Sequence, residues 1–143
     1  MTIATILSVK SSAIVSIAPD ETLQTASALL TEKRVGALIV LDANGKLVGI
    51  VSERDVVRMC SQHGAAAMIF LVRDAMTQNV LTAAPRDGID SAMARMTDRH
   101  VRHLPILDGD SLVGIVSIGD LVKAKIDEAL SDADAMRAYI ATG

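Results

Sequence analysis

The sequence predicts an α+β fold, an α/β sandwich assembled from one structural unit that occurs twice. The segment 49–55, Gly-Ile-Val-Ser-Glu-Arg-Asp, returns 65 residues later at 114–120 as Gly-Ile-Val-Ser-Ile-Gly-Asp. Residues 35–42 align with residues 101–108 at an offset of 66, and the Ala-Pro pair at 18–19 returns at 84–85 with the same offset. A repeat of this length predicts two similar substructures with equivalent sites.

Each half is predicted to begin with a short helix, an extended segment and a longer helix. In residues 1–9, Ile3, Ile6 and Leu7 recur at helical spacing, and residues 69–75 are the counterpart of this segment. Residues 13–17 are extended and run into Pro19, after which Asp20 can cap a helix that reaches about residue 33. The equivalent helix of the second half carries its apolar face at Ile89, Ala92, Met93 and Met96.

Two strands and a second long helix complete each half. Residues 38–41 and 47–51 flank Asn44 and Gly45, which favour a hairpin turn because both residue types tolerate positive φ. Both strands are mostly continuous aliphatic segments, which predicts burial on both faces with a helix against one side. Ser52 opens a helix to about residue 61, and Asp120 opens its equivalent. Each half therefore has the order strand, helix, strand, strand, helix.

An amphipathic extension follows the second half. Its apolar residues recur every three or four positions over residues 123–141, namely Ile126, Ala129, Leu130, Ala133, Met136 and Ile140. This spacing allows the helix either to cover the core or to pack against another subunit. The predicted divisions are repeat 1 over residues 1–66, repeat 2 over residues 67–124 and a helical tail over residues 125–143.

Composition limits the classes of function. The 143 residues have a net charge of −3 with scattered Lys and Arg, which argues against a nucleic-acid-binding surface. The longest apolar run, residues 65–72, is too short to span a bilayer, and residues 1–9 do not resemble a secretory leader. We therefore expect a cytoplasmic protein without a membrane partner. Cys60 has no second thiol with which to form a disulfide, and we expect it to be buried as a small apolar side chain.

Few residues point to catalysis. His100 and His103 lie three positions apart, with Asp108 further along the chain, but no third ligand completes a zinc pattern. No nucleophile motif, phosphate-binding loop or dinucleotide fingerprint is present. We expect no catalytic residue and no metal; an enzyme or metal protein that uses His100, His103 and Asp108 is the alternative.

The repeated Gly-x-x-Ser-x-x-Asp segment has two interpretations. Ser52 with Asp55, and Ser117 with Asp120, have the spacing of a capping box, in which the serine hydroxyl and the carboxylate accept hydrogen bonds from the first N–H groups of a helix. The second interpretation is that the two carboxylates each accept two hydrogen bonds from a vicinal diol, such as that of a ribose. The serines would then contact the same sugar or its phosphate.

The whole pattern resembles that of the cystathionine β-synthase (CBS) domain family. The resemblance covers residues 1–124 as a tandem pair and rests on segments 19–20 and 85–87, on segments 35–42 and 101–108, on the two Gly-x-x-Ser-x-x-Asp segments and on the lead-in 73–77. It implies two βαββα repeats related by a pseudo-twofold axis. It further implies two clefts that bind AMP, ADP or ATP, or in some members NAD(H) or S-adenosylmethionine, without turnover.

Alignment with the family assigns residues to each cleft. The first cleft would contain Ser52, Arg54, Asp55, Asn79, Val80, Arg102, His103 and Leu104. The second would contain Ser117, Asp120, Ser12, Ala13, Ile14, Val35, Gly36 and Ala37. Because Arg54, Arg102 and His103 belong to the first, we expect that cleft to prefer the more highly charged nucleotide. In place of aromatic stacking, the adenine would lie between aliphatic side chains: Ile14, Val35, Val80 and Leu104.

The resemblance implies a stand-alone regulatory protein that senses adenylate charge or a cofactor. It would act through a homodimer or through a protein partner in trans. Candidate residues for the dimer surface are Met59, Met93, Met96 and Met136. The alternative is a structural or interaction module with unoccupied clefts, in which the repeated serines and aspartates serve only as helix caps.

Overall fold

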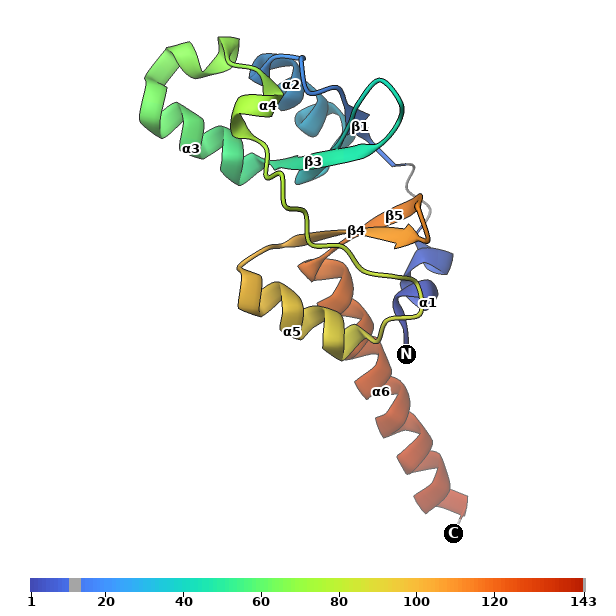
Figure 1. Ribbon diagram of the computed structural model, residues 1–143. Helices are drawn as coiled ribbons and strands as arrows, with labels where there is room; N and C mark the ends of the chain where they lie inside the picture. The colour runs from blue at the N-terminus through green and yellow to red at the C-terminus, as the bar shows by residue number, and fades with distance from the viewer. Residues whose placement is uncertain (11–13, 143) are drawn as a thin grey trace. The chain divides into compact units, whose positions relative to one another are not determined.

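A computed structural model describes residues 1–10 and 14–142 and confirms the predicted α+β architecture (Figure 1). The elements follow the order α1 (Ile3–Val9), β1 (Ser16–Ile17), α2 (Leu23–Lys33), β2 (Ala37–Leu41), β3 (Leu47–Ser52), α3 (Glu53–His63), η1 (Gly64–Ile69), α4 (Val72–Ala75), α5 (Ile89–Arg99), β4 (His103–Asp108), β5 (Ser111–Ser117) and α6 (Ile118–Thr142). None of the helices in these ranges combines the length and the apolar character that a membrane crossing requires.

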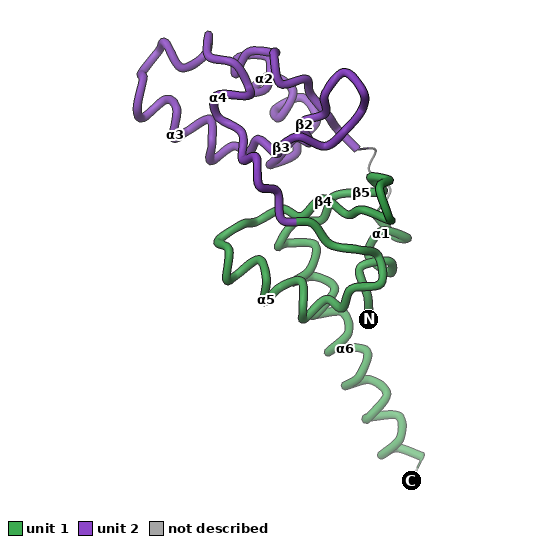
Figure 2. The backbone as a smooth tube through the Cα atoms, viewed as in Figure 1, with its two compact units in different colours: residues 1–12, 82–143 green, residues 13–81 purple. Residues whose placement is uncertain are grey.

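The chain forms two compact units that exchange their lead-in segments (Figure 2). Unit 1 contains residues 1–12 and 82–143, and unit 2 contains residues 13–81. In unit 1 the start of α1 is held to the second repeat by the Ile3 N–H, which donates to the Asp87 carbonyl at 3.0 Å. In unit 2 the Val72 N–H of α4 donates to the Glu21 carbonyl at 2.8 Å. The predicted divisions, with boundaries at residues 66/67 and 124/125, follow the sequence repeat, and they stay a prediction.

The sheet of unit 2 has the strand order β1-β2-β3. β1 is parallel to β2, and β2 is antiparallel to β3 with Ala37 opposite Ser52. Four consecutive residues of β2 are buried, as its continuous aliphatic sequence predicts. The buried core of this unit consists of Ile17, Leu23, Ala26, Leu30, Leu38, Val40, Val51, Met59, Ala67, Val72 and Ala75.

The sheet of unit 1 is smaller than the predicted repeat. It contains the antiparallel pair β4 and β5, and the expected first strand is reduced to a parallel bridge between Ala83 and Ile106. Ala83 makes both of its ladder hydrogen bonds, whereas the preceding Thr82 carbonyl accepts from Arg95 Nη2 at 2.6 Å. The pairing with β4 is therefore confined to Ala83, and the neighbouring Thr82 carbonyl is bonded to a side chain.

The predicted hairpin turn is confirmed between β2 and β3. Gly45 has a φ of 77°, and Asp42 Oδ1 accepts from the backbone N–H groups of Asn44 and Lys46, both at 2.9 Å. An aspartate that bonds to the backbone two residues ahead is a common turn device. The turn is therefore held by contacts within five residues of chain.

The prediction that Cys60 is buried is wrong: its thiol is free and its side chain is exposed. On α3 the residues that face the core are Asp55 and Met59, four positions apart. Cys60 follows Met59 directly, and one residue turns a helix by about 100°, which carries Cys60 off the buried face. Among the methionines considered for a dimer surface, Met59 and Met96 are core residues, whereas Met136 is 63% exposed.

Two strand glycines allow the exchanged segments to cross the sheets. A Cβ on Gly49 would lie 2.6 Å from Met76 Sδ and 3.0 Å from the Thr77 carbonyl oxygen. Thr77 cannot move away easily, because its N–H and carbonyl both bond to Ile50. A Cβ on Gly114 would lie 2.7 Å from Leu7 Cδ2, the far end of a side chain. The same position is therefore restricted by backbone in unit 2 and by a mobile methyl group in unit 1.

We expect Gly49→Ala to lower the free energy of unfolding by about 1–3 kcal/mol, the usual cost of overpacking, and Gly114→Ala to lower it less. The reason is that Leu7 can rotate its methyl group, whereas Thr77 is fixed by two hydrogen bonds. Urea denaturation followed by circular dichroism measures both changes. Equal losses for the two variants would contradict this account of the crossing.

Candidate functional site

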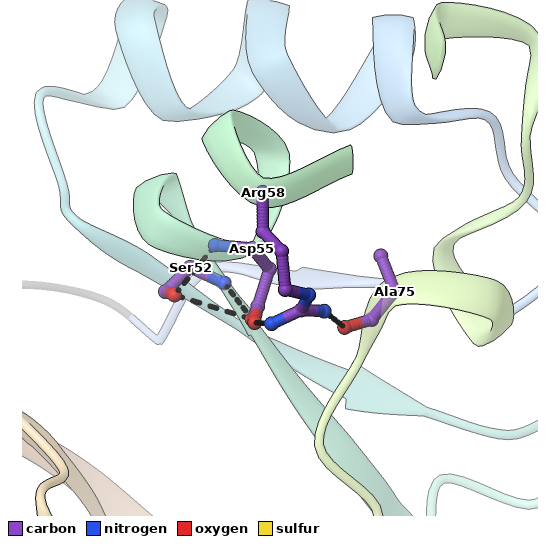
Figure 3. Close-up of polar contacts among 4 residues, drawn as sticks. All are labelled: Ser52, Asp55, Arg58 and Ala75. Atoms are coloured by element: carbon purple, nitrogen blue, oxygen red, sulfur yellow. Dashed lines mark hydrogen bonds and ion pairs between the residues drawn. The ribbon is translucent and has the colours of Figure 1, made fainter. Parts of the chain in front are cut away.

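The first capping box joins β3 to α3 in unit 2 (Figure 3). Asp55 Oδ2 accepts from the Ser52 N–H at 2.9 Å and from Ser52 Oγ at 3.2 Å, and the Asp55 N–H donates to Ser52 Oγ at 3.3 Å. This is the reciprocal geometry that the Ser-x-x-Asp spacing predicts. The structural interpretation of the motif is therefore satisfied in this repeat.

Arg58 neutralises the Asp55 carboxylate. Its Nη1 donates to Asp55 Oδ1 at 2.8 Å, and its Nη2 donates to the Ala75 carbonyl at 2.9 Å (Figure 3). Asp55 is only 7% exposed, and a buried carboxylate is tolerated when it is paired and hydrogen-bonded. Both oxygens of Asp55 are engaged, and Arg58 ties α3 to the end of α4.

The second box, at the junction of β5 and α6 in unit 1, is more open. Asp120 Oδ2 accepts from the Ser117 N–H at 2.8 Å and from Lys10 Nζ at 2.7 Å, and the Asp120 N–H donates to Ser117 Oγ at 3.1 Å. The Asp120 side chain is 28% exposed, against 9% for Asp55. The bonds from the Ser117 N–H and from Lys10 both end on Oδ2, so neither of them uses Asp120 Oδ1.

Lys10 lowers the pKa of Asp120. Partial burial raises the pKa of the Asp120 carboxyl, but the hydrogen bonds from Lys10 and Ser117 together with the positive charge of Lys10 outweigh this effect and hold the pKa below its ordinary value. Lys10 Nζ also donates to the Ile115 carbonyl at 2.9 Å. The ammonium group therefore connects the lead-in segment to both β5 and α6.

The two cations come from positions that are not equivalent in the repeats. Arg58 corresponds by its offset to Lys123, and Lys10 corresponds to Met76. The Asp55 and Arg58 pair has the i,i+3 spacing that sequence reasoning can recognise on a helix. Lys10 lies 110 residues from Asp120 in the chain, and no local pattern connects them.

Each box adjoins the first strand of the antiparallel pair in its own repeat, β2 or β4. In unit 2 the Glu53 N–H donates to the Gly36 carbonyl at 3.0 Å, and Ala37 lies opposite Ser52. In unit 1 the Ile118 N–H donates to the Arg102 carbonyl at 2.8 Å, and His103 lies opposite Ser117. The structure thus brings Arg102 and His103 to the Asp120 box, and Gly36 and Ala37 to the Asp55 box.

The other predicted site residues differ in exposure. Arg54 and Asn79 are exposed, Ile14, Val35 and Val80 are half-buried, and Leu104 is fully buried. Ser12 and Ala13 lie outside the described residues. Each predicted cleft takes residues from both units. The assignment of these residues to shared clefts therefore stays a prediction.

The residues of the histidine alternative lie at the ends of secondary-structure elements. His100 ends α5 in the left-handed conformation with a φ of 55°, as Arg34 does at the end of α2. His103 begins β4, and Asp108 ends it. Within residues 1–10 and 14–142, no three side chains of the types that bind metals gather closely enough to hold an ion.

The chain belongs to the CBS domain family, whose model matches it twice, over residues 6–61 and 72–127. A CBS domain-containing protein of Arabidopsis thaliana, mitochondrial CBSX3, is 34% identical over 87% of this chain, which spans 62% of that protein. The CBS domain-containing protein YhcV of Bacillus subtilis is 31% identical over 76% of both chains. The expected family resemblance is therefore confirmed.

Solved structures agree with the fold. The CBS-domain containing protein ATU1752 from Agrobacterium tumefaciens has a TM-score of 0.84 at 36% identity, over 87% of this chain and 92% of its own. The CBS domain pair of protein MJ0100 has a TM-score of 0.79 at 23% identity, over 90% and 98% of the two chains, and was solved with 5′-methylthioadenosine and S-adenosyl-L-methionine. At that identity the likeness to MJ0100 concerns the fold alone.

We expect Lys10→Met to flatten the dependence of stability on acid pH. Asp120 has a lowered pKa in the folded state, so its stabilising contribution is present above the carboxyl pKa of the unfolded chain and is lost as the pH falls through the folded value. Because the pair is about a quarter exposed, the loss at neutral pH is at most about 1 kcal/mol. Urea unfolding at a series of pH values measures the effect.

The matched control is Lys123→Met, which removes the same charge from the exposed position equivalent to Arg58. It should leave the pH dependence of the free energy of unfolding close to that of the parent protein. If Lys10→Met and Lys123→Met have the same pH profile, Lys10 does not set the ionisation of Asp120.

Proposed function

We propose that the chain is a non-catalytic regulatory module that binds an adenosine nucleotide or a related adenosyl cofactor, with Asp120 as the acceptor for the ribose diol. The observation that carries this proposal is the open carboxylate of Asp120. Its pKa is lowered, its side chain is 28% exposed, and the hydrogen bonds from the Ser117 N–H and Lys10 both reach Oδ2. An ionised carboxylate accepts hydrogen bonds from two neighbouring hydroxyls without donating any itself.

The surroundings of Asp120 suit an anionic ligand. The box begins α6, and the start of a helix favours a nearby negative charge such as a phosphate. Arg102 is exposed, and its carbonyl is bonded to the first residue of α6. Because an arginine can make two parallel hydrogen bonds to a phosphate, Arg102 is the side chain we assign to that group.

The Asp55 box is proposed as the weaker of two sites. Its carboxylate is 9% exposed, and Arg58 occupies its Oδ1, whereas neither the Ser117 N–H nor Lys10 uses Oδ1 of Asp120. A diol that used Asp55 would have to displace Arg58 and give up its bond to the Ala75 carbonyl. Capping is therefore the principal role of Asp55, and ligand binding is secondary.

The proposed ligand carries an adenosyl group, and the proposed assembly is a homodimer with a protein partner. The candidates are AMP, ADP, ATP, NAD(H) and S-adenosylmethionine. Support for adenosyl ligands comes from the 5′-methylthioadenosine and S-adenosyl-L-methionine in the MJ0100 structure, a protein of the same fold. We propose a cytoplasmic homodimer that passes the bound state to a protein partner in trans. Linkage requires that the partner have different affinities for the liganded and free forms.

A first experiment compares Asp120→Asn with Asp55→Asn by isothermal titration of ligand-stripped protein with AMP, ATP, NADH and S-adenosylmethionine. Asparagine retains helix capping but lacks the charge that accepts both hydroxyls. Loss of a charged hydrogen bond costs about 1.5–3 kcal/mol, so Asp120→Asn should weaken binding roughly 10- to 150-fold. Asp55→Asn should change the affinity of the tighter site, at Asp120, very little. Equal effects of the two changes would contradict the ranking of the sites.

A second experiment tests the assignment of Arg102. In the Asp55→Asn protein, Arg102→Ala should weaken ATP or AMP more than adenosine, because only the nucleotides carry phosphate. If the alignment of Arg102 with the Asp55 site is correct instead, the loss will be seen in the Asp120→Asn protein. Equal losses for ATP and adenosine would remove Arg102 as a phosphate contact.

The second candidate function is a structural or interaction module whose boxes only cap helices. It is favoured by the completeness of the internal bonding: among the described residues, no buried side-chain nitrogen or oxygen lacks a hydrogen bond. Absence of both heat and thermal stabilisation with all four ligands would establish this candidate.

A further inference from the structure

The long helix α6 uses only its first turns to pack within unit 1. Leu121 is fully buried, whereas every residue from Ala129 to Thr142 is exposed. Figure 1 shows this part of α6 running beyond the other elements of its unit. The tail therefore does not cover the core, which was one of the two expectations for it.

An apolar stripe follows the exposed side of α6. We call it the tail stripe, and it consists of Val122, Ile126, Ala129, Leu130, Ala133, Met136 and Ile140. Among its large members, Ile126 is 54% exposed, Leu130 60%, Met136 63% and Ile140 72%. At about 100° per residue the centre of the stripe lies roughly 110° around the helix from the buried Leu121.

The spacing of the tail stripe is that of a coiled coil. Val122, Ala129 and Met136 recur every seven residues, and Ile126, Ala133 and Ile140 form a second series with the same period. The two series alternate by three and four positions, as the a and d positions of a heptad do. The stability of a helix in water comes mainly from packing its apolar face against another element. A single helix that exposes such a stripe lacks this packing.

We propose that the tail stripe pairs with the same stripe of a second copy of this chain, with the two α6 helices parallel and in register. This names the surface of the homodimer in the proposed function, and it does not depend on nucleotide binding. Because the stripe is apolar along its whole length, two identical copies are complementary to each other in this register.

The charges beside the stripe favour this orientation. With Ile126, Ala133 and Ile140 at the a positions, Asp132 directly precedes an a position. In a parallel pair such a residue faces the residue five positions later on the partner helix. Asp132 therefore faces Arg137 of the partner subunit, twice by symmetry. Arg137 is 81% exposed, and its contact with Asp134 is a long one, with 3.7 Å between Nη1 and Oδ1. Its side chain is therefore able to turn toward a partner. No like charges face each other in this arrangement.

Antiparallel arrangements are less favourable. Full overlap in that orientation sets Asp132 against Asp132 of the partner subunit and Lys123 against Arg137 of the partner subunit, which repel. A shifted antiparallel register that pairs Lys125 with Asp132 of the partner subunit carries Ile140 past the start of the partner's α6. Half of the exposed stripe would then remain in water.

The first test measures the mass of the full chain by sedimentation equilibrium. We expect a dimer for the parent protein and at least a 100-fold weaker dimer for Ile126→Glu with Ile140→Glu, because four carboxylates would enter the apolar seam. Both side chains are more than half exposed, so unit 1 should keep its fold. The matched control, Ser131→Glu with Ala138→Glu, adds the same charge to the opposite side and should remain dimeric.

The second test fixes the orientation. In a Cys60→Ser background, Ala129→Cys should form a disulfide-linked dimer on mild oxidation, because a parallel register brings both copies of position 129 together; Ala138→Cys should not. Asp132→Arg and Arg137→Asp should each weaken the dimer, and the double exchange should restore it.

Each outcome decides between the claims. A monomeric parent protein would overturn both the homodimer and the role of the tail stripe. A dimer that survives Ile126→Glu with Ile140→Glu would overturn the tail stripe alone and leave the homodimer to another surface. Failure of Ala129→Cys to link, or of the double charge exchange to restore the dimer, would overturn the parallel register.

Discussion

The structure of each unit depends on a carboxylate held at the start of a helix by a serine and a cation. The serine and the backbone bind the carboxylate within three residues, and the cation then connects it to a more distant segment. In unit 2 that connection runs through Arg58 to the Ala75 carbonyl, and in unit 1 it runs through Lys10 to the Ile115 carbonyl. A carboxylate at low exposure is stable only when it is paired, so strand, helix and lead-in segment are held to one another.

The difference between the two boxes shows why a motif alone does not identify a binding site. The same four-residue spacing gives a carboxylate whose oxygens are both engaged at Asp55, whereas at Asp120 the bonds from the Ser117 N–H and Lys10 share one oxygen. The deciding factor is the position of the cation. Arg58 approaches from the same helix and covers Asp55 Oδ1, whereas Lys10 approaches from the lead-in segment and shares Asp120 Oδ2 with Ser117.

Helix α6 carries both proposals. Its first turn contains Asp120, and its exposed part carries the tail stripe, within one continuous helix of 25 residues. Within residues 118–142 the buried contacts are confined to the beginning of the helix, where Leu121 packs in unit 1. The remainder has a sequence suited to a partner helix and no such partner in its own unit.

The sequence by itself determined the repeat, the order of most elements, the hairpin at Gly45 and both capping boxes, because these features arise from contacts within a few residues. Tertiary structure decided the exchange of lead-in segments, the pairing of Lys10 with Asp120, the exposure of Cys60 and the reduction of one strand to a bridge at Ala83. These features join segments far apart in the chain, and packing selects them among many local alternatives of similar energy. The family resemblance located the repeated carboxylates, but only their surroundings distinguished Asp120 from Asp55.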